Sequence, residues 1–160
     1  MGMYTGIRFK GFVKPEFREG FEIVGIRGDW EEHSDPIIRA FGNIGRSSFI
    51  PRGSLAYMPD SWESEPDMSL EPYLTEWYDS RKPTDGFKRS YDEKTGYWTF
   101  QCSLKNYEYE IESFFEILPH FIENIEHLEY FYEEWDFSTQ YDLVDGEIKL
   151  INKEFKDYRY

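Results

Sequence analysis

Residues 97–118 read YWTFQCSLKNYEYEIESFFEIL, and two periodicities in this stretch decide the predicted fold. Over Gly96–Lys105 apolar and polar residues alternate, which predicts a β-strand with one face in the core. From Asn106, a favourable N-cap, apolar residues recur every three or four positions to Leu118, which predicts an amphipathic helix that Pro119 ends or kinks. The side chains expected to face the core are Trp98, Phe100, Cys102 and Leu104 from the strand and Ile111, Phe114, Phe115 and Leu118 from the helix, with Thr99, Gln101 and Ser103 pointing outward.

Further strand patterns extend the sheet on either side of this stretch. Asp145-Gly146 is a typical two-residue hairpin turn, and the residues around it fit two strands. The pattern over Glu126–Phe137 places bulky side chains on both faces of a strand, so this strand is expected in the interior of the sheet. The expected strands are Tyr4–Val13, Phe87–Tyr91 joined through DEKTG to Gly96–Lys105, Glu126–Phe137 as the interior strand, Thr139–Val144 and Glu147–Ile151.

Proline and glycine positions predict helices in the first half of the chain. Residues 42–69 are rich in Gly, Ser and Pro, which predicts irregular structure with one short strand near Leu55–Met58. The sum is an α+β fold, a mostly antiparallel sheet with two main helices packed on one face, in a single domain over residues 1–160. The expected helices are one opened by Lys14-Pro15 with Phe17, Phe21 and Val24 as its stripe and Gly25 or Gly28 as its end, one from the N-cap Asp35 to Phe41, and one over Glu71–Tyr78.

The amino-acid composition limits the classes of protein to which this chain can belong. Aromatic residues make up 20% of the 160 residues, enough bulky apolar material for a core despite 31% charged residues. The lone Cys102 excludes an internal disulfide framework and a multi-cysteine zinc site. No run approaches the roughly 18–20 apolar residues of a membrane span, and the first residues lack a signal-peptide core. We therefore expect a cytoplasmic protein that does not interact with membranes.

The negative charge is concentrated in one segment. The net charge is −14, and no Lys or Arg occurs from Asn106 to Ile148, 43 residues that contain thirteen acids. The rest of the chain has nineteen acids against eighteen bases, which is nearly neutral. Such a protein is repelled by polyanions, so direct binding to nucleic acid is not expected.

The functional interpretation of this segment is a carboxylate array presented to a basic protein partner, because electrostatic attraction acts over about 8 Å at physiological salt. Glu108, Glu112 and Glu116 repel one another at four-residue spacing, by about 0.2–0.5 kcal/mol per pair, and no nearby base in the sequence relieves the repulsion. The alternative is a solvated face that only keeps the protein soluble. The residues expected to bind the partner are Glu108, Glu112, Glu116, Glu123, Glu126, Glu129, Glu133, Glu134 and Asp136.

A second candidate site is the loop GNIGRSSFIPRGSLAY at residues 42–57, which contains no acid. Its glycine-flanked amides and its arginines could bind a phosphate or carboxylate, which favours a small-molecule or nucleotide-binding domain centred on Arg46–Ser54. It lacks the GxxxxGK[ST] and GxGxxG patterns, and the alternative is a structural loop whose arginines pair with surplus carboxylates. The candidate ligand-binding residues are Arg46, Ser47, Ser48 and Arg52.

No catalytic motif, metal site or cofactor is predicted. His33, His120 and His127 do not have the spacing of HExxH, and no pair of acids stands out as a catalytic pair. Cys102 falls on the apolar side of its strand, which is typical of a buried small residue rather than a nucleophile. A hydrolase with unidentified paired carboxylates is the third interpretation, after a non-enzymatic interaction protein and a ligand-binding domain.

Two blocks, RSSFIPRGSLAYMPDSWE at 46–63 and YWTFQCSLKNYEYEIESFFEILPHFIENIEHLEYFYEEW at 97–135, resemble small acidic proteins of phages and integrated mobile elements. The resemblance covers about a third of the chain and supplies no catalytic residues or cofactor. It implies that the protein binds a host protein. The leading hypothesis is therefore an inhibitor that binds a basic nucleic-acid-handling host or defence protein by partial nucleic-acid mimicry, its acids pairing with Lys or Arg of the partner.

Overall fold

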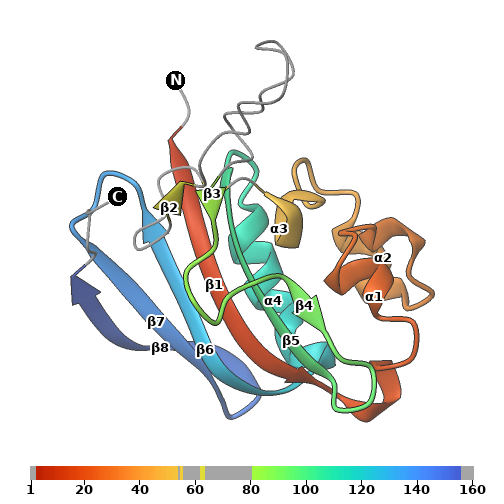
Figure 1. Cartoon of the computed structure of the whole chain (residues 1–160). Helices are drawn as coiled ribbons and strands as arrows, with labels where there is room; N and C mark the ends of the chain where they lie inside the picture. Colours follow the sequence, from red (N-terminus) through yellow and green to blue (C-terminus); the bar gives the residue numbers. More distant parts are fainter. Residues whose placement is uncertain (1–2, 54, 56–61, 64–80, 156–160) are drawn as a thin grey trace, which may run out of the picture.

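A six-stranded antiparallel sheet in the order β4-β5-β1-β6-β7-β8 forms the centre of the computed structural model, which describes residues 3–53, 55, 62–63 and 81–155 (Figure 1). β2 and β3 form a separate two-stranded ladder. The elements are β1 (Tyr4–Val13), the 3₁₀ turn η1 (Pro15–Phe17), α1 (Glu22–Gly25), the 3₁₀ turn η2 (Trp30–Glu32), α2 (Pro36–Phe41), α3 (Phe49–Arg52), β2 (Trp62–Glu63), β3 (Arg81–Lys82), β4 (Ser90–Tyr91), β5 (Tyr97–Lys105), α4 (Glu110–Phe121), β6 (Ile122–Tyr132), β7 (Phe137–Val144) and β8 (Glu147–Phe155).

β1 lies in the interior of the sheet, between β5 and β6. The strand predicted over Tyr4–Val13 is confirmed, and its apolar side chains pack under α4. Phe9 is opposite Phe100 on β5 and Leu128 on β6, so three buried residues from distant parts of the chain meet in one row. This row and the aromatic side chains around it form the core.

α4 covers one face of the sheet and begins at Glu110 with Tyr109 as its N-cap residue, so the predicted N-cap at Asn106 is wrong. The Asn106 side-chain oxygen still accepts a hydrogen bond from the backbone N–H of Ile111 at 2.9 Å, which ties the chain before the helix to its first turn. The helix continues past Pro119 to Phe121, where the prediction had ended it at Leu118. Pro119 lies in the last turn, where its missing N–H removes one backbone hydrogen bond without interrupting a longer helix, and Phe121 adds a further buried ring to the core.

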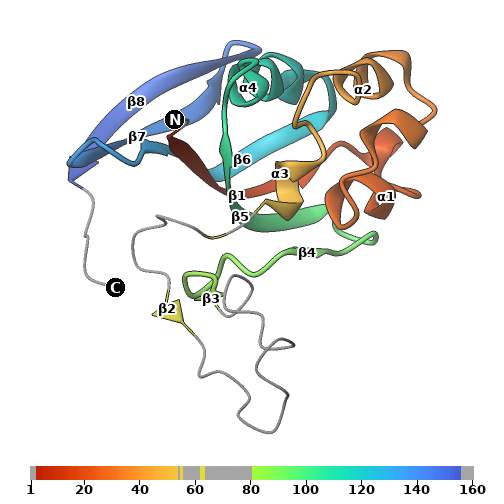
Figure 2. The ribbon, with the colours of Figure 1, turned by 90° about the horizontal axis from the view of Figure 1, so that it is seen from above.

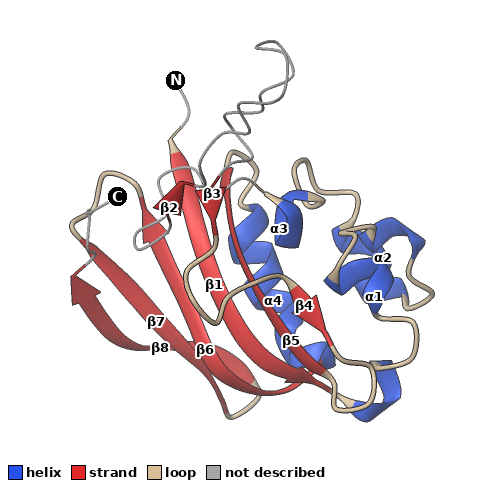
Figure 3. Ribbon diagram, viewed as in Figure 1, coloured by secondary structure: helices blue, strands red, loops and turns tan. Residues whose placement is uncertain are grey.

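The expectation of two main helices is not confirmed, because α4 is the only described helix longer than six residues. The stretch predicted as one helix from Lys14-Pro15 divides into η1 and α1, since Gly20 between them has a left-handed φ of 74°. Phe21 is still fully buried. The short helix after Asp35 is confirmed, with the Asp35 carboxylate accepting hydrogen bonds from the first N–H groups of α2. Figure 3 shows these short helices beside α4.

The opposite face of the sheet is covered by the chain between β3 and β4, which crosses β1 and β5 (Figures 1 and 2). Thr84 donates its backbone N–H to the Gln101 side-chain oxygen at 3.1 Å, and Thr99 donates its hydroxyl to the Lys88 carbonyl. The alternation of β5 is confirmed, but its outward residues are not exposed. The prediction had no signal for this cover, and Thr99, Gln101 and Ser103 are all buried.

The C-terminal half departs from the prediction at one turn. The single strand expected over Glu126–Phe137 is two strands, β6 and β7, because the chain turns after Tyr132 and Trp135 stacks on Phe137 with ring centroids 4.7 Å apart. β6 lies in the sheet interior as expected. The hairpin of β7 and β8 is confirmed, with Asp145 and Gly146 at φ 52° and 78°, as its two-residue turn requires.

Among the described residues, no helix is long and apolar enough to cross a membrane. The expected helix over Glu71–Tyr78 and most of the strand near Leu55–Met58 lie outside the described residues.

Candidate functional site

The nine carboxylates predicted to bind a partner lie in three places. One group precedes or belongs to α4, one lies along β6, and one lies in and next to the turn that joins β6 to β7. These groups are Glu108, Glu112 and Glu116; Glu123, Glu126 and Glu129; and Glu133, Glu134 and Asp136.

The α4 group is partly used to build the helix start. Both Glu112 carboxylate oxygens accept hydrogen bonds from the Asn106 amide, at 2.7 and 2.8 Å, so Glu112 ties Asn106 to the first turn of the helix. The exposed Glu108 carboxylate lies against Gly45, and a Cβ at that position would overlap it. Glu116 is exposed. Glu110 is fully buried; one of its oxygens accepts the Glu108 N–H at 2.6 Å and the other has no hydrogen-bond partner.

Glu129 is a correction to the prediction, because only 8% of this residue is exposed and its carboxylate is bonded inside the protein. It forms an ion pair with Arg8 at 3.1 Å and a 2.9 Å hydrogen bond with His127. Burial by itself would raise the pKa of Glu129, but the His127 hydrogen bond and the Arg8 charge lower it to about 2. Glu129 is therefore a structural carboxylate on the covered face of the sheet.

Sequence reasoning missed this buried cluster around Arg8. The Arg8 guanidinium also bonds the Gln101 side-chain oxygen at 3.2 Å and the Thr84 hydroxyl at 3.1 Å, and it lies 5.2 Å from the centre of the Phe131 ring. The Gln101 side-chain nitrogen is buried without a hydrogen-bond partner. Arg8 alternates with apolar residues on β1, and a base at such a position is normally read as solvent-facing, so no pattern in the sequence indicated burial.

The other carboxylates of β6 and of the turn after it differ in whether they form hydrogen bonds or ion pairs within the protein. Glu123 pairs with Arg18 at 3.3 Å near the surface, and Glu126 accepts the Tyr97 hydroxyl at 2.9 Å. Glu133 accepts the Tyr4 backbone N–H at 2.7 Å. The exposed turn acids without a described hydrogen bond or ion pair are Glu134 and Asp136.

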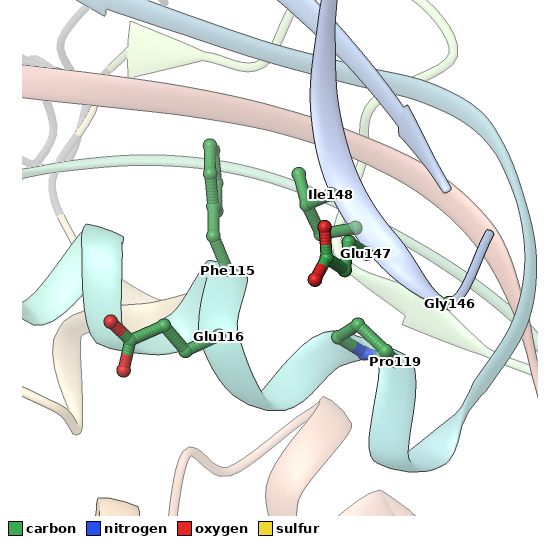
Figure 4. A pocket seen from close by; sticks show the side chains of 6 residues that line it. All are labelled: Phe115, Glu116, Pro119, Gly146, Glu147 and Ile148. Atoms are coloured by element: carbon green, nitrogen blue, oxygen red, sulfur yellow. The ribbon is translucent and has the colours of Figure 1, made fainter. Parts of the chain in front are cut away.

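An acidic groove of about 380 Å³ lies between α4 and the start of β8 (Figure 4). One wall brings Phe115 and Glu116 from α4, and the other brings Glu147 and Ile148 from β8. Pro119 closes the lower part, since its ring projects from the last turn of the helix. The acidic groove thus combines an apolar lining with two acids, Glu147 and Glu116, although the Glu116 carboxylate points away from Glu147. Glu147 was not among the predicted binding residues.

A second opening, the basic pocket, has a volume of about 250 Å³ and lies where α3 meets the first residue of β1 and the end of β5. Arg46 and Arg52 line this pocket, as the alternative hypothesis predicted, and Lys105 adds a third cation. Ser47 is buried and donates its hydroxyl to the Gly42 carbonyl at 3.2 Å, so it is a structural residue and not a ligand-binding one. The described lining residues are Tyr4, Arg46, Phe49, Arg52, Gly53, Ser103, Leu104 and Lys105, and Ser48 is not among them.

The remaining titratable residues serve packing. His120 bonds the Asp35 carboxylate at 3.0 Å and so ties α4 to the start of α2. Burial raises the pKa of the fully buried Cys102 thiol, which disfavours the nucleophilic thiolate. Within the described ranges, no group of three His, Cys, Asp or Glu side chains is placed to hold a metal ion.

Comparisons with protein-family models, with curated proteins and with solved structures find no match to this chain.

Proposed function

We propose that the protein is a non-enzymatic interaction protein that binds a Lys- or Arg-bearing segment of a partner protein in the acidic groove. The observation that carries this proposal is an opening lined by Phe115, Pro119 and Ile148 whose other lining residues include two acids, Glu116 and Glu147. Lys and Arg have apolar stems and charged heads, so a lining of this kind complements both parts of such a side chain.

The charge of the acidic groove is not compensated within the described chain. None of the described ion pairs includes Glu116 or Glu147. Glu116 also lies in the C-terminal half of α4, where the helix dipole makes a negative charge less favourable. A partner cation would relieve both effects, which gives the site a preference for basic ligands.

A narrower version of the proposal makes the partner a nucleic-acid-handling host or defence protein that the carboxylates block by nucleic-acid mimicry. It is supported by the base-free segment of 43 residues and by the exposed turn acids Glu134 and Asp136, which would attract a basic partner at longer range. Since Glu129 is buried and Glu123 is paired, the mimicry would use fewer carboxylates than the sequence predicts.

The test is the anisotropy of a labelled Lys- and Arg-rich peptide titrated with the wild-type protein and with a Glu116→Gln/Glu147→Gln variant. A control variant, Glu31→Gln/Glu32→Gln, removes the same charge from exposed positions in η2. We expect the groove variant to bind several-fold more weakly and the control to bind as the wild type does. Equal binding by all three proteins would refute the acidic groove as the docking site.

If the groove passes this test, capture from nuclease-treated host lysate with the same three proteins would identify the partner. A basic protein retained by the wild type and the control, and lost with the groove variant, would satisfy the proposal.

A further inference from the structure

We propose that the basic pocket binds a small phosphate ester about the size of a mononucleotide. This inference is independent of the acidic groove, since the two openings share no lining residue and carry opposite charge. The chain has a net charge of −14, yet the basic pocket contains three cations and no acid among its described lining residues.

The three cations of the basic pocket keep their charge uncompensated. No ion pair among the described residues involves Arg46, Arg52 or Lys105. Arginines that merely balance surplus carboxylates, as the structural interpretation of this loop requires, would form such pairs. Glu133 is engaged elsewhere, since its carboxylate accepts the Tyr4 backbone N–H, and the exposed Glu108 carboxylate lies against Gly45 without a described ion pair to Arg46.

Neutral groups hold these cations in place. The Arg46 guanidinium lies over the Tyr107 ring at 4.8 Å from its centre, and the Lys105 ammonium lies 5.8 Å from the centre of the Tyr4 ring. Arg52 donates one of its N–H groups to the Arg27 carbonyl at 3.2 Å. Each cation is therefore positioned without losing its positive charge, and Arg retains further donors for an anion.

The backbone that carries the two arginines is anchored to the sheet. A Cβ on Gly53 would lie 2.3 Å from the Ser103 carbonyl oxygen, so only glycine allows α3 to end this close to β5. Gly28, with φ 68°, is similarly close to the Ser48 carbonyl, which fixes the other side of the loop. The basic pocket is thus held open by packing between elements.

The size and lining of the basic pocket select the ligand class. A volume of about 250 Å³ is near the lower limit of small-molecule sites, which excludes a dinucleotide. Two arginines and a lysine match the charge of a phosphate monoester better than that of a single carboxylate. Phe49, 44% exposed, offers an apolar ring on which a flat base can stack.

The experiment is titration calorimetry of the full chain with the four ribonucleoside 5′-monophosphates, the matching nucleosides and inorganic phosphate. We expect at least one monophosphate to bind at least ten-fold more tightly than its nucleoside, with inorganic phosphate competing. The Arg46→Gln/Arg52→Gln variant should lose at least ten-fold in affinity. The control Arg39→Gln/Lys94→Gln, which removes two exposed cations elsewhere, should bind as the wild type does.

The proposal is overturned if no monophosphate or phosphate binds the wild type, if nucleoside and monophosphate bind equally, or if both double variants lose affinity alike. Thermal unfolding of each variant shows that the fold is retained. The Glu116→Gln/Glu147→Gln variant, which changes only the acidic groove, should keep full affinity, so failure here and failure of peptide docking are distinguishable.

Discussion

The acidic groove and the basic pocket lie toward opposite ends of α4 and are built in different ways. The groove takes its charge from exposed carboxylates on two walls that are far apart in sequence, Glu116 and Glu147. The pocket takes its charge from cations backed by aromatic rings and by a carbonyl group. The net charge of −14 therefore describes neither surface, because binding depends on which charges the fold leaves uncompensated.

On the face of the sheet away from α4 lies the cluster of Arg8 and Glu129, where opposite charges compensate each other inside the protein. The Glu129 carboxylate thus stabilises the fold, whereas the exposed carboxylates are free to bind a partner.

Glu129→Ala should lower the free energy of unfolding by about 3–5 kcal/mol, because it leaves the Arg8 charge buried without its partner. Glu134→Ala, at an exposed turn position, should change it by less than about 0.5 kcal/mol. Urea unfolding of the two variants gives both values. If they lose similar stability, buried and exposed carboxylates do not differ as the structure implies. Replacing Arg8 and Glu129 together by Met should recover most of the loss.

Acid should remove the contribution of Glu129 over a defined range of pH. Its folded-state pKa of about 2 lies below the ordinary value of 4.5, so this stability is fully present above about pH 4.5 and is lost as the pH falls toward 2. The difference in pKa corresponds to about 3 kcal/mol. Unfolding free energies measured from pH 5 to pH 2 should therefore fall more steeply for the wild type than for Glu129→Gln. If the unfolding free energies of the two proteins fell equally over this pH range, the lowered pKa of Glu129 would be contradicted.

Gly53→Ala should lower the free energy of unfolding by about 1–3 kcal/mol and weaken mononucleotide binding, because the new Cβ would push α3 away from β5. Gly20→Ala serves as the comparison. Its φ of 74° disfavours alanine by about 1 kcal/mol, but nothing lies near its Cβ and the basic pocket is elsewhere. Calorimetric titration should show reduced affinity only for Gly53→Ala, and unchanged affinity there would mean that the pocket does not depend on this approach.

The smallest expected effect is the salt dependence of peptide binding to the acidic groove. Since Glu116 and Glu147 are near the surface, raising the salt from 50 to 300 mM should weaken binding about three- to ten-fold. The Glu116→Gln/Glu147→Gln variant should show a smaller dependence. An identical salt response in the variant would assign the electrostatic attraction to other carboxylates, with Glu134 and Asp136 as the next to test.

The elements that local patterns determine were predicted from the sequence. The alternation of β1 and β5, the Asp35 cap of α2 and the Asp145-Gly146 turn each depend on residues close together in the chain. The turn that divides β6 from β7 was missed, because the aromatic residues on both sides of it all favour strands.

The binding surfaces were harder to predict, because they depend on residues distant in sequence. Arg8 and Glu129 are 121 positions apart in the chain, yet Arg8 neutralises the Glu129 carboxylate. The absence of bases from a sequence segment therefore did not show that its acids are unpaired in the fold. The same holds for the acidic groove, where Glu147 was missed because its neighbour Glu116 is brought to it only by the curl of β7 and β8 toward α4 (Figure 2). Arg46 and Arg52 were identified because their six-residue spacing keeps them in one loop.

The interior position of β1 also has a consequence for how the chain is made. Its partners are β5 and β6, so its backbone hydrogen bonds join residues about ninety to 130 positions apart, as in the contact of Tyr4 with Glu133. During synthesis β1 leaves the ribosome long before either neighbour exists, and the backbone N–H and C=O groups of one of its edges stay unpaired until β6 has emerged. Contacts of such long range slow folding and expose strands to misassociation. We expect the completion of β6, rather than any local element, to commit the nascent chain to its fold.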